Sequence, residues 1–315
     1  MRKYDIKTSP LYNLSNKKKL KEILHLQNNP KAIKYVLKNK KFYYNEFSIK
    51  QNNNKKREIQ APQDVLKFMQ GKLNTLLLRI KTPDFLFSSK KSNIQNAEYH
   101  KENPFFLSTD IEHFYQNVSE LKVYDMFIKK FCMSKDIAYI LKELVFFYDK
   151  KMNRTVLPTG SPCSQLIAYW TYEKTFNDVN DYCIKNGLKF SLYVDDINIS
   201  SSKIIKSHAL RNIKNRLEYI GLNLKRDKTK FYGSKEEKKV TGCAITRKHN
   251  INIPKEKRQE INNLIKKENI EKIIKTKNIK ALNSIIGKIS YYQRIVPNYQ
   301  NRIYKKLIEI KKSME

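Results

Sequence analysis

The chain has 315 residues and carries 64 Lys and Arg against 30 Asp and Glu, a formal net charge of +34. An excess of this size goes beyond what solubility needs and favours a polyanionic partner that binds more weakly as salt rises. Seven Gly exclude collagen-like and Gly-rich linker classes. Twenty Tyr and 15 Phe supply faces on which unpaired bases could stack, although most of them are expected in the core.

The cysteines indicate a reducing compartment. They are Cys132, Cys163, Cys183 and Cys243, and they form neither a CxxC pair nor a metal-ligand spacing with His. We therefore expect free thiols, no zinc site and no disulfide framework. The first residues lack the apolar stretch of a signal peptide, and no apolar run approaches the ~18 residues of a membrane helix. A cytoplasmic protein with no membrane partner fits these features.

The first hundred residues predict helices around one hairpin. Residues 1–40 form a basic helical region with two apolar stripes. Residues 42–59 have the pattern of strand, polar turn and strand, which predicts a β-hairpin that Pro62 ends. The apolar spacing from Leu66 onward then predicts a helix.

Three consecutive cations, Lys55, Lys56 and Arg57, stand on the return arm of this hairpin. The ordinary interpretation is a solvated charge run. The functional interpretation is a clamp on a nucleoside triphosphate, because Arg offers a planar fork that matches phosphate oxygens.

A predicted strand over residues 105–109 ends in Asp110, and Phe114 and Tyr115 follow it. An Asp at the end of a buried strand suits a metal site at the rim of a sheet. The alternative is an Asp that caps a helix. Residues 119–156 are then expected to be mostly helical, with Leu121 among the core positions.

A loop rich in Pro, Gly and Ser spans residues 157–164 and leads into a predicted helix over 165–186. Such a loop at a helix N-terminus can receive an anion or the backbone of a ligand. By itself this signal is weak.

Residues 190–200 carry apolar side chains at every second position on both sides of a short acidic centre. This alternation predicts a tight β-hairpin with Asp195 and Asp196 at the bend, and with Asp195 at a strand end. The alternative is an ordinary Asp-containing turn.

The C-terminal third is basic and mostly helical. A helix over 210–219 precedes a basic stretch over 221–230 and a pair of short strands over 239–245. Residues 251–315 hold 16 Lys and Arg against 6 Asp and Glu. We expect a small helical bundle with one side packed and the other free for phosphates.

Three carboxylates, Asp110, Asp195 and Asp196, are each expected at a strand end or a hairpin bend. Neighbouring strands of an antiparallel sheet can bring such ends into one cluster. Two Mg²⁺ ions about 3.5–4 Å apart could then activate an attacking hydroxyl and stabilise a leaving pyrophosphate. Hard oxygen ligands suit Mg²⁺ without help from His or Cys.

With these motifs in place, the chain resembles a reverse transcriptase. The box over residues 193–196 is similar to the catalytic hairpin of that family, and Asp110 with Tyr115 matches its first metal-binding motif and its aromatic gate. Ile111 follows Asp110 directly, and we expect it to belong to the same metal site. Lys228 resembles the lysine near the leaving pyrophosphate.

The loop with Thr159 and Gly160 resembles the family's nucleotide-contacting loop, so the resemblance adds both residues to Lys56 and Arg57 as nucleotide-binding. Many family members have Gln where Thr159 stands, and commonly Pro where Gln165 stands. These departures put in question a Gln-type contact to the nucleotide.

Two short signatures narrow the resemblance to bacterial retron reverse transcriptases. One comprises Asn96, Ala97 and His100, and the other comprises residues 240–242. The resemblance implies that RNA binding involves both signatures and two basic residues of the last helical region, and the residues concerned are Asn96, His100, Val240, Thr241, Gly242, Lys288 and Arg294.

The implied fold is α+β, a right-hand polymerase with fingers, an antiparallel-sheet palm and a helical thumb. Its expected divisions are an N-terminal basic region over 1–40, fingers over 41–102 and 119–156, palm over 103–118, palm and primer grip over 157–249, and thumb over 250–315.

The implied activity is RNA-directed DNA synthesis from dNTPs with two Mg²⁺ ions. A dedicated structured non-coding RNA serves as template, one of its 2′-hydroxyls serves as primer, and the product is an RNA–DNA hybrid. Such systems act in anti-phage defence with an effector protein. The alternatives are another bacterial reverse transcriptase, of the intron-derived or abortive-infection type, and a non-catalytic RNA-binding protein. The oligomeric state is left open.

Overall fold

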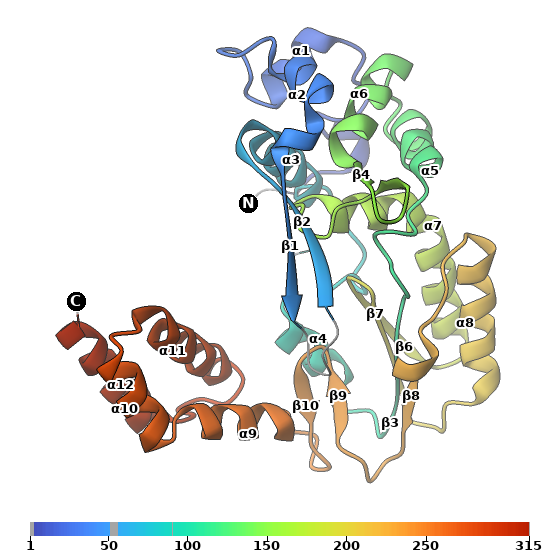
Figure 1. The fold of residues 1–315 in the computed structure, drawn as a ribbon. Coiled ribbons are helices and arrows are strands. Elements are labelled where there is room, and N and C mark those ends of the chain that lie inside the picture. The colour runs from blue at the N-terminus through green and yellow to red at the C-terminus, as the bar shows by residue number, and fades with distance from the viewer. Residues whose placement is uncertain (1–2, 51–55, 90, 315) are drawn as a thin grey trace.

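A four-stranded antiparallel sheet in the order β6-β7-β3-β8 lies at the centre of the computed structural model, which describes residues 3–50, 56–89 and 91–314 (Figure 1). The sheet was expected from the strand patterns, and its antiparallel pairing is confirmed. Its strands are β3 (Phe105–Asp110), β6 (Lys189–Tyr193), β7 (Asp196–Ser201) and β8 (Lys230–Tyr232).

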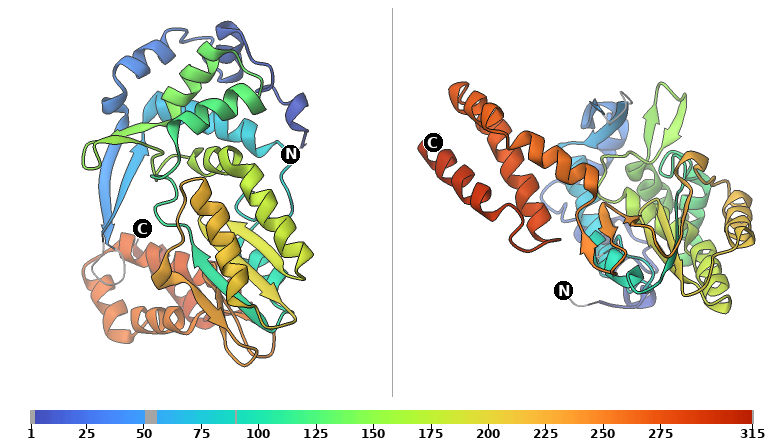
Figure 2. Two further views of the ribbon diagram at one scale, coloured as in Figure 1. Left: turned by 90° about the vertical axis from the view of Figure 1, so that its right-hand side faces the viewer. Right: turned by 90° about the horizontal axis from the view of Figure 1, so that it is seen from below.

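The two faces of this sheet differ in character. Successive side chains of a strand point to opposite faces, so Phe190 and Leu192 lie on one face and Ser191 on the other. The apolar face joins the main hydrophobic core with α7 (Ser164–Lys185) and α8 (Ser207–Tyr219), which lie side by side in Figure 2. On the opposite face, α4 (Asn93–His100) contacts the polar side chains of β6 and β7.

The N-terminal elements agree with the sequence. The predicted hairpin consists of β1 (Tyr44–Lys50) and β2 (Lys56–Pro62), and it does end at Pro62. Its turn, with Asn52, Asn53, Asn54 and Lys55, lies outside the described residues. The helices around it are α1 (Lys17–Ile23), α2 (Ala32–Lys38) and α3 (Asp64–Leu78).

Residues 119–156 hold a hairpin that the sequence did not predict. After α5 (Glu120–Asp125), a single π-helical turn over Met126–Lys130 and α6 (Lys135–Val145), two short strands pair as β4 (Phe147–Asp149) and β5 (Arg154–Val156).

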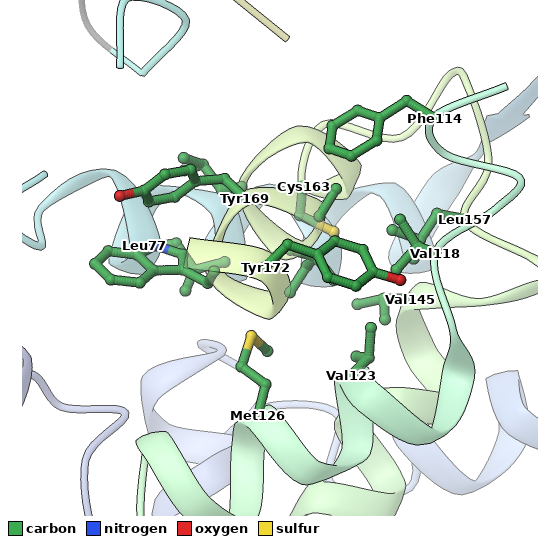
Figure 3. Packing of buried hydrophobic residues seen from close by; sticks show 14 of the residues in the cluster. Leu77, Phe114, Val118, Val123, Met126, Val145, Leu157, Cys163, Tyr169 and Tyr172 are labelled. Atoms are coloured by element: carbon green, nitrogen blue, oxygen red, sulfur yellow. The ribbon is translucent and has the colours of Figure 1, made fainter. Parts of the chain in front are cut away.

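The placement of Leu121 in the core was also wrong, because its residue surface is 70% exposed. The buried face of α5 runs through Val123 instead. In Figure 3, Val123 and Met126 point toward Tyr172 on the long helix α7.

A second hydrophobic core holds the C-terminal region together. It begins with the sheet of β9 (Lys238–Val240), β10 (Cys243–Ile245) and β11 (Ile251–Asn252). The expected basic helices follow, and Figure 1 shows them as a unit to one side of the central sheet. They are α9 (Lys255–Leu264), α10 (Lys267–Lys275), α11 (Ile279–Gln293) and α12 (Asn301–Met314). Among the described residues, no helix is both long and apolar enough to span a membrane.

Candidate active site

The hairpin between β6 and β7 turns one residue earlier than the sequence predicted. Tyr193 pairs with Asp196, so the two turn residues are Val194 and Asp195 rather than Asp195 and Asp196. The expectation that Asp195 ends a strand is corrected accordingly, since Asp196 is the first residue of β7.

Val194 has φ +61°. A positive φ at the first turn residue alone is the pattern of a type II′ turn. A β-branched residue is disfavoured there, at a cost of about 1–3 kcal/mol, and such strain tends to occur at functional sites.

The strand register brings the predicted carboxylates to one edge of the sheet. Asp110, the last residue of β3, lies directly opposite Asp196 on β7. The next amide, that of Ile111, donates to the backbone oxygen of Asp195 at 2.8 Å. The side chain of Ile111 is buried. Its position therefore ties the end of β3 to the hairpin turn.

The carboxylates repel one another in a partly buried setting. Burial raises the pKa of Asp195, and the charge of Asp110 raises it further. Burial raises the pKa of Asp196 to about 8, and its contact with Asp110 adds to this effect. Lys228 places a positive charge here, since its Nζ lies 2.5 Å from Asp110 Oδ2, and this bond raises the pKa of Lys228. The site thus concentrates negative charge that a cation would stabilise.

The donor chemistry of this edge fits Mg²⁺, because three carboxylates supply hard oxygens. Among the residues that the structure describes, no three His, Cys, Asp or Glu side chains are arranged as a ready metal cluster. The side chain of Asp110 is held by Lys228 instead. Binding of a cation by all three carboxylates would therefore use Oδ1 of Asp110 or displace Lys228 from Oδ2.

Two further predicted residues lie near the carboxylates. Burial raises the pKa of both Tyr115 and Asp195, and the positive charge of Arg57 lowers both by a smaller amount, so Arg57 lies within electrostatic range of both side chains. Tyr115 stacks on Phe114, with ring centroids 5.8 Å apart. Lys56 is adjacent to Arg57 on β2 and therefore points to the other side of the hairpin.

The loop with Thr159 and Gly160 docks onto β2. The amide of Gly160 donates to Gln60 O at 3.2 Å, and a Cβ at Gly160 would lie 2.8 Å from Ala61 Cα. Only Gly permits this approach. The hydroxyl of Thr159 donates to Glu58 O at 3.0 Å and is thus engaged with the protein. Gln60 was not singled out in the sequence, because the loop contact joins residues about a hundred positions apart.

The second signature forms the tight turn between β9 and β10. Val240 pairs with Cys243, so Thr241 and Gly242 are the two turn residues, with φ +43° and +84°. Positive φ at both positions defines a type I′ turn, in which Gly is favoured at the second place. Thr241 is half-buried and Gly242 is exposed, whereas Val240 is fully buried.

Asn96 and His100 were predicted to contact RNA, and their burial contradicts this. Both side chains are 0% exposed, and both are hydrogen-bonded within the protein. The same correction applies to the buried side chain of Val240. Burial lowers the pKa of His100 to about 3, so its ring is neutral at physiological pH. These three residues support the fold around the site rather than contact a ligand.

The two signatures meet in space, although 145 positions separate Asn96 from Thr241. Asn96 Nδ2 donates to Thr241 Oγ1 at 3.2 Å, and Asn93 Nδ2 donates to Thr241 O at 3.1 Å. Asn93 also bonds Tyr291 of α11. Asn93 and Tyr291 were missed in the sequence, since only the fold places them together.

The two predicted basic contacts of the helical region differ in their surroundings. Lys288 Nζ lies 2.6 Å from Glu260 Oε1, so its charge is compensated. Arg294 is exposed just beyond the end of α11, and its charge lowers the pKa of Tyr291 against the larger effect of burial.

An antiparallel sheet with carboxylates at one hairpin end, flanked by a helical unit on each side, defines the class of right-hand polymerases, and the expected α+β fold is confirmed. Residues 49–245 match the family described as reverse transcriptase (RNA-dependent DNA polymerase). Since the match covers more than half of the chain, the chain belongs to this family.

The similar curated proteins are retron enzymes, as the signatures predicted. The chain is 28% identical over 247 residues to the retron Se72 reverse transcriptase of Salmonella heidelberg, a match that covers 75% of this chain and 63% of that protein. It is 26% identical over 226 residues to the retron Ec86 reverse transcriptase of Escherichia coli, covering 70% and 68%. The match thus spans less than two thirds of the Salmonella protein.

Solved structures of telomerase are also similar. The telomerase of Candida albicans in complex with a TWJ fragment of telomeric RNA aligns with a TM-score of 0.47 and 12% identity, over 85% of this chain and 61% of that one. The apo telomerase of Candida tropicalis aligns with a TM-score of 0.46 and 12% identity, over 73% and 60%.

Proposed function

We propose that this chain is the RNA-directed DNA polymerase of a retron, acting in the bacterial cytoplasm. The observation that carries the proposal is the meeting of Asp110, Asp195 and Asp196 at one sheet edge in a member of the reverse transcriptase family. The similarity to retron enzymes supports the finer assignment. We assign the central sheet to a palm, the β1–β2 hairpin to fingers and the helices after residue 250 to a thumb.

The reaction joins a hydroxyl oxygen to the α-phosphorus of a dNTP and releases pyrophosphate. Asp110, Asp195 and Asp196 would hold two Mg²⁺ ions, which supply charge neutralisation and activation of the attacking hydroxyl. Lys228 lies beside the carboxylates, where its ammonium can neutralise the leaving pyrophosphate. Arg57 on β2 lies within electrostatic range of Asp195, and its guanidinium suits the triphosphate.

Tyr115 is assigned to the sugar of the incoming nucleotide. Its ring is stacked on Phe114 and half-buried, within electrostatic range of Asp195. A ring at this position would leave no room for a 2′-hydroxyl, which selects dNTPs. In the loop, Thr159 has its hydroxyl engaged elsewhere, so a contact to the nucleotide would come from the backbone around Gly160.

The template is proposed to be a structured non-coding RNA that also supplies a 2′-hydroxyl as primer, giving a branched RNA–DNA product. The net charge of +34 and the basic helices after residue 250 support binding of such a polyanion. Thr241, Gly242 and Arg294 are the remaining candidates for contact with it. A role in anti-phage defence with an effector protein completes the proposal.

Sequencing of the nucleic acid that copurifies with the protein tests this assignment. We expect one structured RNA joined to complementary DNA, and we expect the protein to extend a primer on an RNA template with dNTPs and Mg²⁺. A protein that copurifies with RNA but extends no primer would refute the polymerase and favour a non-catalytic RNA-binding role.

A further inference from the structure

A line of hydrogen-bonded side chains connects the C-terminal helices to the catalytic hairpin. It starts at Asn93, the first residue of α4, whose Nδ2 donates to Tyr291 Oη on α11 at 2.6 Å and to Thr241 O at 3.1 Å. These three residues, Asn93, Thr241 and Tyr291, are called the clasp below. They join three elements that are far apart in the sequence, namely α4, the β9–β10 turn and α11.

The line continues from the clasp into the protein through Asn96. Its Nδ2 donates to Thr241 Oγ1 at 3.2 Å, and its Oδ1 accepts from Ser191 Oγ at 2.6 Å. Ser191 lies on β6, four residues before Asp195. One buried amide therefore links the clasp to the strand that leads into the catalytic turn.

The hydrogen-bonding roles beyond Asn96 follow from the number of protons available. Because Ser191 donates its one proton to Asn96, it must accept from His100 Nε2, at 2.8 Å. A neutral ring then carries no proton on Nδ1, which accepts from Ser200 Oγ at 2.8 Å. Ser200 in turn accepts from Asn103 Nδ2 at 2.7 Å. One arrangement of protons satisfies the whole line, so α4 is fixed to β6 and β7 in one register.

At its other end, the clasp reaches the protein surface beside the β9–β10 turn. The residue surface of Tyr291 is 36% exposed. Its hydroxyl would lie 3.9 Å from a Cβ at Gly242, in the β9–β10 turn. The second core packs α11 against the other C-terminal helices, so a contact made by Tyr291 fixes the position of that whole unit.

We propose that the Asn93–Tyr291 hydrogen bond is a positioning contact that holds the C-terminal helical unit against α4 and the β9–β10 turn, which Asn96 links to the first strand of the catalytic hairpin, and so sets the grip on the primer–template duplex. The proposal rests on the polymerase function above. Asn93 and Tyr291 are positioning residues and touch no reacting atom.

The test compares Tyr291→Phe with Tyr304→Phe, which makes the same chemical change on α12. We expect Tyr291→Phe to speed dissociation of a DNA-primed RNA template by about 2- to 10-fold, the range of one neutral hydrogen bond. The number of nucleotides added per binding event should fall by the same factor. The rate of the first addition in a preformed complex should stay within about twofold, since the carboxylates are untouched. Tyr304→Phe should match the wild type.

A second variant, Asn93→Ala, removes the partner. If the two residues act through one bond, the double variant will dissociate no faster than Asn93→Ala alone. Multiplied effects, or a Tyr291→Phe protein that dissociates at the wild-type rate, would overturn the proposal. A fall in the first-addition rate without faster dissociation would also overturn it. An inactive wild-type protein would instead refute the polymerase function.

Discussion

The β6–β7 hairpin has two regions that differ in their energetics: its tip holds unfavourable interactions, and its polar face holds favourable hydrogen bonds. At its tip, Asp195 and Asp196 gather like charges beside Asp110, and Val194 takes a strained conformation. On its polar face, Ser191 and Ser200 are buried, and both hydroxyls are bonded to His100. Unfavourable features persist in proteins where function needs them, whereas satisfied polar networks fix a fold. The tip is therefore where we place the chemistry, and the polar face is where we place support.

Removal of a carboxylate at the tip should have the largest effect. Asp195→Asn takes away charge that stabilises the cations of the reaction, a loss of several kcal/mol, so we expect primer extension to fall by roughly 1,000-fold. Filter binding should show affinity for the RNA within about twofold of the wild type, because binding depends on many phosphate contacts. Appreciable extension by Asp195→Asn would contradict the assignment.

The sugar gate should give the next largest effect. Tyr115→Val opens space at the proposed 2′ position, so we expect the preference for dNTP over rNTP to drop by at least about 10-fold. Single-nucleotide incorporation with each substrate measures the ratio. Phe114→Leu serves as the control, since Phe114 stacks beneath Tyr115 in the core. Unchanged discrimination in Tyr115→Val would remove the gate from the account.

On the polar face, the expected effect is on stability. His100→Gln cannot reach Ser191 and Ser200 together, and each polar group left unpaired costs about 1–3 kcal/mol. We expect the midpoint of thermal unfolding to fall by about 3–8 °C, with RNA affinity of the folded protein unchanged. A variant with full stability and weakened RNA binding would restore His100 as an RNA contact.

The same residue predicts a pH dependence. The pKa of His100 is about 3 in the folded protein against an ordinary 6.5, so the unfolded chain binds one more proton between these values. The free energy of unfolding is therefore fully maintained above pH 6.5 and decreases as pH falls below it, by up to about 1.4 kcal/mol per pH unit. Between pH 7 and 5.5, denaturant unfolding should show a smaller decrease in His100→Gln than in the wild type. Equal decreases would contradict the burial of a neutral ring.

The smallest expected effects are on the salt dependence of RNA binding, and they differ between two basic residues of the helical unit. Lys288 is paired with Glu260, so Lys288→Gln should barely change the salt dependence of RNA binding. Arg294 is exposed, and Arg294→Gln should lower the slope of log affinity against log salt by about 1. Equal slopes for the two variants would show that neither residue neutralises a phosphate.

The sequence predicted the tip well because its signals are local. Alternating apolar residues placed the strands, and carboxylates at strand ends predicted the meeting of Asp110 with Asp196. The turn position was off by one residue, because Asp is a common turn former while Val at φ +61° is rare. The short β4–β5 hairpin was missed because three-residue strands carry too little alternation to detect.

The polar face could not be predicted from the sequence. Asn96 and His100 have the residue types of a binding site, and nothing local distinguishes a ligand contact from a buried bond to Ser191. Asn93 and Tyr291 contact each other across 198 positions, so their contact exists only in the fold. The sequence indicates burial only for apolar stripes, so it could not show that these polar side chains are buried.

The contrast between tip and polar face is tested most directly by measuring primer extension at 20 °C and thermal unfolding for Asp196→Asn and His100→Gln together. Asp196→Asn removes a partly buried carboxyl whose ionisation is disfavoured, so it should unfold at or above the wild-type temperature and extend no primer. His100→Gln should unfold at a lower temperature and extend primers at a rate within a few-fold of the wild type. Primer extension by Asp196→Asn, or an inactive but fully folded His100→Gln, would contradict the division between a catalytic tip and a supporting polar face.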